Sequence, residues 1–366
     1  MKVPFNDLRR IHKPIEAKII KKFEKVVKEN NFVLNEEIKN FEKEYSLFSN
    51  SKFAVSCANG TDAIELILRA LNISKGDEVI LPTNTFIATA LAVTRAGATP
   101  VFVDNNKYYL IDFKKIEGKI NEKTKAIIAV NLYGQLADLK KLNAIAKKYS
   151  LYLIEDSAQS HGASNSNFTS KSNSIGAAYS FYPGKNLGAW GDGGMITTNN
   201  KKLYEKVELL RNWGSVKKYE HKVFGFNSRL QPLQGVVLSE KLKNLNQWNA
   251  ERQEIAKTYI ENLSELKSVV LPDVMKDNIH VWHVFAIRSK KRNDLLNNKK
   301  IHGIEFGIHY PKPIHRQKAY KEHKQYNSNI ELADLYCNQL LSLPIFPKMK
   351  KTEIDHVLTT LKKYLN

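Results

Sequence analysis

The sequence predicts an α/β protein in which a large domain with a mostly parallel mixed sheet, flanked by helices, is followed by a smaller α+β domain. Two observations predict this class. Short apolar runs alternate with amphipathic helical patterns from about residue 53 to residue 200, as in sheets whose parallel strands are connected by helices. After about residue 265 the pattern restarts on a smaller scale. We therefore expect a large domain over residues 1–264 and a small C-terminal domain over residues 265–366.

The spacing of apolar residues predicts the individual elements. Apolar side chains three or four positions apart indicate helices at 14–29 and 36–48, ahead of the sheet. The expected strands of the large domain are 53–57, 79–81, 101–103, 126–130, 151–155, 177–181 and 195–198. One helix is expected to begin at 61, after the first strand, and another to end at 96, before the third. Further helices are expected at 138–149, 201–213, 232–245 and 246–263. The small domain should contain a strand at 284–288 and helices near 291–302, 330–341 and 352–364.

The composition excludes several classes of protein. The 366 residues carry 57 Lys and Arg against 37 Asp and Glu, a formal charge of +20, and 42% of them are hydrophobic, enough for a sizeable core. The excess lysines are scattered as pairs with no block of five or six like charges, so we expect no nucleic-acid partner. No stretch approaches the ~18 apolar residues of a membrane span, and the first residues lack the apolar core of a signal peptide. We expect no membrane partner and a cytoplasmic protein.

Only two cysteines occur, Cys57 and Cys337, and they lie far apart in the sequence. One chain therefore cannot assemble a disulfide framework or a cysteine-based zinc or iron–sulfur site. We expect two buried thiols and no bound metal.

The most unusual segment of the chain is the glycine-rich stretch 183–194. It is not a Walker loop, because Tyr179 stands where the first glycine is required and Asn186 follows the lysine. It is not a dinucleotide fingerprint either, because Ile196 occupies the place of the third glycine and a strand-like run follows. What remains is Lys185, held in a glycine-flanked turn between two strands. By itself this pattern leaves open whether Lys185 is functional or simply solvated.

Two further segments place polar groups where expected strands end. Residues 155–162, which include Asp156, Gln159 and His161, follow the strand at 151–155, and ligands of open α/β sheets bind at the carboxyl ends of strands. Residues 59–62 follow the strand at 53–57 and begin a helix, whose free N–H groups suit a phosphate. Ordinary helix capping is the alternative explanation for both segments.

Together these motifs resemble the DegT-type sugar aminotransferases, which are pyridoxal-phosphate enzymes of the aspartate-aminotransferase fold, fold type I. Seven stretches carry the resemblance in family order: 58–63, 82–89, 132–135, 155–159, 180–188, 191–194 and 227–229. Gln231 and Gly235 depart from the family pattern without touching an expected cofactor contact. The glycines usual in the turn after Ala163 are replaced by residues 164–171, so the shape of this loop is not predicted.

The resemblance implies the roles of the cofactor-binding residues. Lys185 would form the Schiff base with the aldehyde of pyridoxal 5'-phosphate and then move the proton, and Asp156 would pair with the pyridine nitrogen. These two residues are the expected catalytic pair. The further expected contacts are Gln159 at the ring hydroxyl, Phe86 on the ring face, Gly60, Thr61 and Ser180 at the phosphate, and Asn227 reaching the phosphate from a neighbouring subunit. The last contact implies a homodimer with shared active sites.

The resemblance also implies the reaction. We expect transamination through the pyridoxamine 5'-phosphate form, with L-glutamate as amino donor and a nucleotide-linked keto sugar as acceptor. Relatives that are dehydratases lack the lysine or carry an iron–sulfur cluster, whereas this chain has Lys185 and too few cysteines for such a cluster. The expected substrate contacts are His161, Tyr182, Tyr219, His221, His309, Tyr310 and His315, with the segment 217–221 coming from the partner subunit.

The identity of the sugar is the least determined part of this interpretation. The His-Tyr-Pro pattern at 309–311 and the His-Gly pair at 161–162 resemble enzymes that convert dTDP-3-keto-6-deoxyhexose to dTDP-3-amino-3,6-dideoxyhexose. UDP-linked 3-keto sugars and 4-keto sugars are the close alternatives. A protein that only senses a ligand or binds nucleic acid on the same fold is the alternative of another class.

Overall fold

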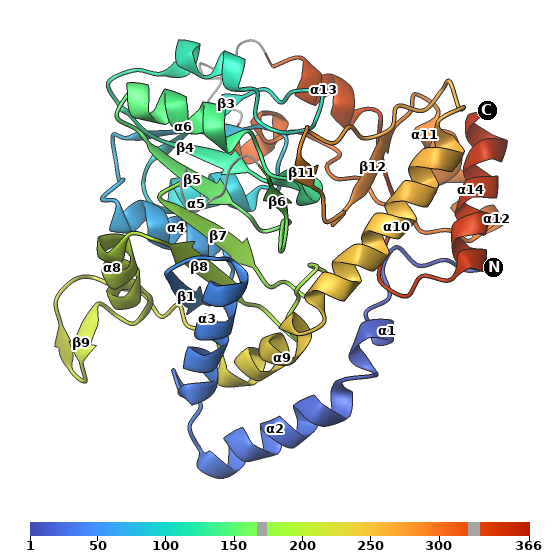
Figure 1. The fold of residues 1–366 in the computed structure, drawn as a ribbon. Coiled ribbons are helices and arrows are strands. Elements are labelled where there is room, and N and C mark those ends of the chain that lie inside the picture. The colour runs from blue at the N-terminus through green and yellow to red at the C-terminus, as the bar shows by residue number, and fades with distance from the viewer. Residues whose placement is uncertain (167–173, 321–329) are drawn as a thin grey trace.

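The computed structural model describes residues 1–166, 174–320 and 330–366, and its centre is a seven-stranded mixed sheet (Figure 1). The strand order is β1-β8-β7-β5-β4-β2-β3. Strand β8 runs antiparallel to both of its neighbours, whereas β7, β5, β4, β2 and β3 pair in parallel. The strands are β1 (Phe53–Cys57), β2 (Glu78–Pro82), β3 (Thr99–Val103), β4 (Thr124–Val130), β5 (Tyr152–Asp156), β7 (Gly176–Ser180) and β8 (Gly194–Thr198). The mostly parallel sheet predicted from the sequence is therefore confirmed.

Helices cover both faces of this sheet. Successive residues of a strand point to opposite faces, and Ile128 of β4 packs in the core under α4, α5 and α8, while its neighbours Ile127 and Ala129 pack with α6. Helices α3 and α9 cover the sheet at β1, β7 and β8. The helices of this part are α1 (Arg9–His12), α2 (Glu16–Glu29), α3 (Glu36–Phe48), α4 (Gly60–Ala70), α5 (Ala88–Arg95), α6 (Leu139–Lys148), α8 (Lys201–Arg211), α9 (Pro232–Leu242) and α10 (Leu245–Leu263).

Short polar residues set where several of these helices begin. The side chains of Asn35, Asn59, Asp138 and Asn200 each accept a hydrogen bond from a backbone N–H in the first turn of α3, α4, α6 and α8. Such caps satisfy N–H groups that have no partner inside the helix. They explain why the predicted starts of these helices lie within a few residues of the observed ones.

The C-terminal part packs around a second core, to which distant segments contribute. Helix α10 runs from the sheet to this part (Figure 1), and Ile255, Tyr259 and Leu263 from its second half are buried there with Val3. The C-terminal elements are β12 (Phe285–Arg288), α11 (Arg292–Asn297), α12 (Lys299–His302), α13 (Leu332–Cys337), β13 (Leu340–Leu343) and α14 (Lys351–Leu365). Helix α10 ends close to the predicted domain boundary near residue 265, and the division into two domains stays a prediction.

The structure corrects two of the predicted C-terminal elements. The helix expected near 330–341 ends at Cys337, and Leu340–Leu343 form β13, which pairs antiparallel with β12. A short buried run such as this one has no helical or strand periodicity, so only its pairing decides the assignment. The helix expected near 291–302 is two helices, α11 and α12, separated at Asn298.

Among the described residues, the short elements that were not predicted are α1, four strands of two or three residues and several 3-10 turns. The strands are β6 (Ser164–Asn165), β9 (Ser215–Lys217), β10 (Glu220–His221) and β11 (Asn278–Ile279). Strands β6 and β11 pair with each other. Strand β6 begins the loop at 164–174 whose shape was not predicted, and residues 167–173 of that loop lie outside the described residues.

The expectation of two buried thiols is confirmed for Cys57 and Cys337. Within the described ranges, no helix combines the length and the apolar character that a membrane crossing requires.

Candidate active site

Asp156 is the last residue of β5, and its carboxyl group is buried at the carboxyl edge of the sheet. The hydroxyl of Thr89 donates to one carboxyl oxygen at 2.7 Å, and the N–H of Ala158 donates to the other at 3.2 Å. Burial raises the pKa of Asp156, while these two hydrogen bonds and the charge of Lys185 act in the opposite direction. The carboxyl group thus lies in a low-dielectric site that favours pairing with a cation.

Lys185 lies in the turn between β7 and β8, as predicted. Its N–H donates to the carbonyl of Tyr182 at 2.9 Å. A Cβ atom on Gly188 would stand 2.3 Å from the carbonyl oxygen of Pro183, so this turn closes only with glycine at that position. Burial lowers the pKa of Lys185 to about 8, and Asp156 opposes the shift. About a tenth of Lys185 is therefore a neutral, nucleophilic amine at pH 7, far more than of a lysine with an ordinary pKa.

A corner is formed where the start of α4 lies against Ser180. Asn59 caps the helix through the N–H of Asp62 at 2.9 Å, and Gly60 and Thr61 form the first turn. A Cβ atom on Gly60 would stand 2.7 Å from Cβ of Ser180. The close approach brings Gly60, Thr61 and Ser180 together at the positive end of the helix, where an anion is stabilised.

Phe86, Tyr310 and Gln159 form a group of aromatic and amide side chains. Phe86 is 54% exposed, and the centroid of its ring lies 5.8 Å from that of Tyr310. Gln159 donates to the Tyr310 hydroxyl at 3.0 Å and accepts from the N–H of Tyr133 at 2.7 Å. An exposed ring beside fixed polar groups suits the stacking of a planar aromatic ligand.

His161 is fully buried, and both of its ring nitrogens bond protein groups. Nε2 lies 2.9 Å from the carbonyl oxygen of Ser180, and Nδ1 lies 2.8 Å from the hydroxyl of Tyr45. Because a carbonyl only accepts, Nε2 must carry the proton and Tyr45 must donate to Nδ1. Burial lowers the pKa of His161 to about 4. His161 thus anchors the Ser180 backbone, and its predicted contact with substrate stays a prediction.

His309 and His315 reach the same edge of the sheet from the C-terminal part. Nδ1 of His309 lies 2.8 Å from the Ser342 hydroxyl, and burial with the nearby charge of Lys185 lowers the pKa of His309 to about 4. The hydroxyl of Tyr133 donates to the carbonyl of His309. Nδ1 of His315 lies 2.7 Å from the Thr83 hydroxyl, directly after β2. His315 is therefore fixed at the end of β2, and His309 is fixed between β13 and the turn that follows β4.

Four predicted residues lie elsewhere or point to solvent. Tyr182 is exposed on the Lys185 turn. Tyr219 and His221 lie in the β9–β10 segment, which projects from the body of the molecule (Figure 1), and Asn227 follows it on the surface. Within the described part of a single chain, no contact joins Tyr219, His221 or Asn227 to the Lys185 cluster. Their predicted roles require a second subunit.

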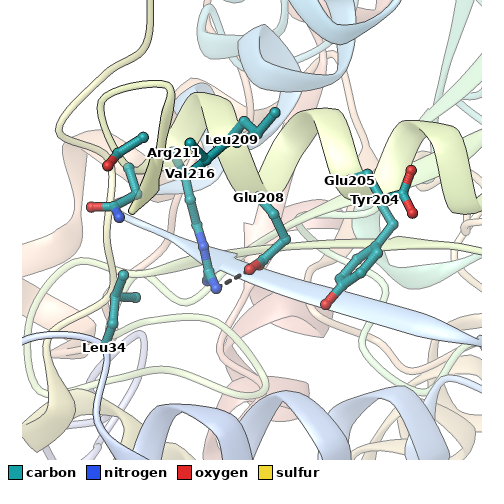
Figure 2. A pocket seen from close by; sticks show the side chains of 9 residues that line it. Leu34, Tyr204, Glu205, Glu208, Leu209, Arg211 and Val216 are labelled. Carbon is teal, nitrogen blue, oxygen red and sulfur yellow. Dashed lines mark ion pairs between the residues drawn. The ribbon is translucent and has the colours of Figure 1, made fainter. Parts of the chain in front are cut away.

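A cavity of about 440 Å³ is lined by residues other than these, among them Leu34, Tyr204 and Arg211 (Figure 2). It is bordered by α8 and the start of β9, and the ion pair between Arg211 and Glu208 at 2.5 Å lies along its wall. None of the predicted site residues lines it. We therefore place the chemistry at Lys185 rather than in this cavity.

Sequence reasoning missed two residues of this region, Thr89 and His283. Thr89 lies inside the stretch 82–89 that carried the resemblance, but its contact with Asp156 is between side chains 67 positions apart. His283 lies 3.2 Å from the side chain of Asn186, which directly follows Lys185. No spacing rule connects a residue at 283 with one at 186.

Comparison with known proteins agrees with this geometry. The chain matches the model of the DegT/DnrJ/EryC1/StrS aminotransferase family over residues 13–362. It is 44% identical to a dTDP-3-amino-3,6-dideoxy-alpha-D-galactopyranose transaminase of Aneurinibacillus thermoaerophilus, covering 99% of both chains. It is 40% identical to a UDP-N-acetyl-3-dehydro-alpha-D-glucosamine 3-aminotransferase of Acidithiobacillus ferrooxidans, covering 100% of this chain and 98% of the relative.

A solved structure from Bacillus subtilis with bound pyridoxamine phosphate has a TM-score of 0.92 to this chain at 33% identity, covering 100% of this chain and 85% of the other. The residues present here suit the same cofactor. The start of α4 beside Ser180, at the positive end of the helix, can take its phosphate, the exposed Phe86 ring can cover its ring, and the buried Asp156 can meet its nitrogen. This chain belongs to the DegT/DnrJ/EryC1/StrS aminotransferase family and is a pyridoxal-phosphate-dependent sugar aminotransferase of fold type I.

Proposed function

We propose that this protein transfers the amino group of L-glutamate to C3 of a dTDP-linked 3-keto-6-deoxyhexose. The observation that carries the proposal is the placement of a buried carboxyl group, Asp156, within electrostatic reach of a lysine of lowered pKa, Lys185, in a site that includes a helix N-terminus. Burial makes the amine of Lys185 nucleophilic. It also strengthens the attraction for a cation of the Asp156 carboxylate, whose charged form the hydrogen bonds from Thr89 and Ala158 stabilise.

Each of these residues has a defined task in the proposed reaction. When bound, pyridoxal phosphate supplies an aldehyde that takes up the amino group and a ring that withdraws electrons from the reacting carbon. Lys185 binds that aldehyde through Nζ and afterwards moves a proton with the same atom. Asp156 holds a proton on the ring nitrogen, and Gly60 and Thr61 bind the phosphate.

The choice of sugar and partner subunit rests on the relatives and on the placement of exposed residues. The relative at 44% identity acts on a dTDP-linked 3-amino sugar, which supports the dTDP-linked substrate. The relative at 40% identity carries a UDP-linked sugar in its name, so the UDP-linked 3-keto sugar is the alternative. The exposed positions of Tyr219, His221 and Asn227 support a homodimer in which these residues complete the site of the partner. The proposal places the reaction in the cytoplasm, where nucleotide-linked sugars and glutamate occur.

The visible spectrum of the purified protein tests the proposal. L-Glutamate should convert the band of the lysine-bound cofactor to that of the pyridoxamine form, and one member of a panel of dTDP- and UDP-linked 3-keto and 4-keto sugars should restore it. Restoration by a UDP-linked sugar alone would replace the proposed substrate by its alternative. Failure to bind pyridoxal phosphate at all would contradict the proposed role of Lys185 and favour a protein that only senses a ligand.

A further inference from the structure

We infer that His283 is a further substrate-binding residue, whose Nε2 accepts a hydrogen bond from a sugar hydroxyl next to the carbon that receives the amino group. The inference rests on the proposed function and names a contact within that site. His283 lies just before β12, on the C-terminal side of the molecule, and its ring is half-buried.

The backbone of His283 is held against the turn that follows β4. The N–H of Val284 donates to the carbonyl of Tyr133 at 3.3 Å, and a Cβ atom on Gly134 would stand 3.0 Å from the nitrogen of His283. Such close approach explains why a glycine with φ of +115° occupies position 134. The ring of His283 is thereby brought to the residue that follows Lys185, with Nδ1 3.2 Å from Oδ1 of Asn186.

The side chain of Asn186 determines which nitrogen of His283 carries the proton. Nδ2 of Asn186 donates to the carbonyl of Val281 at 2.9 Å and to Oδ1 of Asn249 at 2.9 Å. A carbonyl only accepts, so the amide nitrogen of Asn186 must face Val281 and its oxygen must face His283. That oxygen also only accepts, and therefore Nδ1 of His283 carries the proton.

The side chain of Asn249, which bonds Asn186, gives a second reason to place the proton of His283 on Nδ1. Nδ2 of Asn249 donates to the carbonyl of His161 at 2.9 Å, so Oδ1 of Asn249 must accept from Asn186. Gly162 makes room for this amide, since a Cβ atom there would stand 2.8 Å from Nδ2 of Asn249. Two backbone carbonyls, at His161 and Val281, thus set the direction of every hydrogen bond between them.

The consequence is an acceptor without a partner beside the reacting lysine. Burial lowers the pKa of His283 well below its usual range, with further lowering by the nearby charges of Lys185 and Arg252. The ring is therefore neutral, and with the proton on Nδ1 the lone pair is on Nε2. Over residues 1–166, 174–320 and 330–366, no hydrogen-bond partner contacts Nε2 of His283.

The chemistry of the proposed substrates identifies the donor. Phosphate oxygens and glutamate carboxylates only accept near neutral pH, so they cannot satisfy Nε2. The amino group of glutamate can donate, but in the proposed reaction it is taken up by the cofactor aldehyde. The hydroxyl groups of the sugar can donate, and those on the two carbons flanking the keto carbon lie nearest to the position that Lys185 must reach. His283 would then favour sugars that carry a hydroxyl at that position.

Two substitutions separate the two nitrogens of His283. His283→Asn keeps a donor near Nδ1 but lacks Nε2, whereas His283→Gln places an amide oxygen near Nε2 but loses the donor to Asn186. We expect His283→Asn to lower kcat/KM for the keto sugar by about 10- to 100-fold and the glutamate half-reaction by less than about threefold. His283→Gln should regain part of the loss. His356→Asn, the same substitution on α14, is the matched control and should behave as wild type.

Sugar analogues identify the hydroxyl. Removing the hydroxyl at C2 or at C4 of the sugar should lower kcat/KM of wild type to the level of His283→Asn for one of the two analogues, while the variant itself should not discriminate that analogue. If His283→Asn impairs the glutamate half-reaction as strongly as the sugar half-reaction, or impairs neither, the inference is wrong although the proposed function stands. If wild type aminates no keto sugar, the proposed function and the inference fail together.

The protonation state can be measured without turnover. In ¹⁵N spectra of histidine-labelled protein, Nδ1 of His283 should show the shift of a protonated nitrogen and Nε2 that of an unprotonated one, and the signal of Nε2 should move when the amino-sugar product binds. A protonated Nε2 in the free protein would overturn the inference.

Discussion

Thr89 and Asp156 are joined by a hydrogen bond of 2.7 Å in which the hydroxyl of Thr89 donates to the buried carboxyl group. Thr89 lies on α5 and Asp156 at the end of β5. Burial alone raises the pKa of Asp156, and Thr89 stabilises the charged form. Thr89 thus helps to keep the carboxylate ionised in an apolar site.

We expect Thr89→Val, which removes the hydroxyl and keeps the shape, to lower kcat by about tenfold because a charged acceptor loses its donor. Since the lost hydrogen bond lowered the pKa of Asp156, the acid limb of the pH–rate profile should move to higher pH. Thr94→Val, on the exposed side of the same helix, is the control. An unshifted acid limb in Thr89→Val would show that Thr89 does not tune Asp156.

Lys185 should load pyridoxal phosphate faster as the pH rises. Burial lowers the pKa of Lys185 to about 8, so the neutral amine becomes the major form above that pH. The rate at which the absorption band of the lysine-bound cofactor grows in the cofactor-free protein should rise from pH 6.5 to 9, with a midpoint near pH 8. Lys185→Ala should form no such band and should lose turnover. Loading at a rate independent of pH would contradict the assignment of Lys185.

Gly60→Ala should weaken binding of pyridoxal phosphate by at least about tenfold, because the new Cβ atom would stand 2.7 Å from Cβ of Ser180 and push the two segments of the phosphate corner apart. The dissociation constant can be measured by titrating the cofactor-free protein. Gly118→Ala is the matched control, because its Cβ atom meets nothing within 4 Å. Equal affinities of the two variants would place the phosphate elsewhere.

Subunits with different defects should rescue each other if the sites are shared. Lys185→Ala and Asn227→Ala should each be impaired alone. In an equal mixture allowed to exchange subunits, about half of the dimers combine the two variants, and each of these has one intact site, so about a quarter of the wild-type activity should return. Exchange should be verified by native mass spectrometry. Mixed dimers without recovered activity would show that Asn227 serves the site of its own chain.

Lys241 should make the stability of the cofactor-free protein depend on pH. Its Nζ is buried, donates to the carbonyl of Gly188 and lies 3.1 Å from Nε2 of His12, and burial lowers the pKa of Lys241 to about 7. Between about pH 7 and 10 the unfolded chain therefore binds a proton that the folded chain lacks, so the free energy of unfolding rises with pH in that window.

Lys241→Met removes this proton, and the rise in the free energy of unfolding should become shallower by up to about 1.4 kcal/mol per pH unit. Urea unfolding at pH 7, 8 and 9 measures the slope. Lys243→Met, which changes an exposed lysine paired with Glu240, should keep the wild-type slope. An unchanged slope in Lys241→Met would show that Lys241 keeps its proton throughout the window.

Local sequence patterns were sufficient for most of the large domain. The strand at 53–57 was predicted with its observed bounds, and the helix start near 61 follows from Asn59, because caps and apolar spacing act over a few residues. The short run Leu340–Leu343 was not recognised as a strand, because its partner β12 lies more than fifty residues earlier.

For the candidate active site, the sequence by itself was enough to predict which segments carry the chemistry, since the turn at Lys185 and the strand end at Asp156 are local features that match family motifs. The tertiary structure decided what surrounds them. Thr89 donates a hydrogen bond to Asp156, and His161 bonds the backbone of Ser180. The side chain of His283 contacts that of Asn186. These contacts join residues whose spacing in the chain follows no period, and the pKa values of Lys185 and Asp156 depend on the burial that such contacts create. Only folding brings these groups together and removes the water between them.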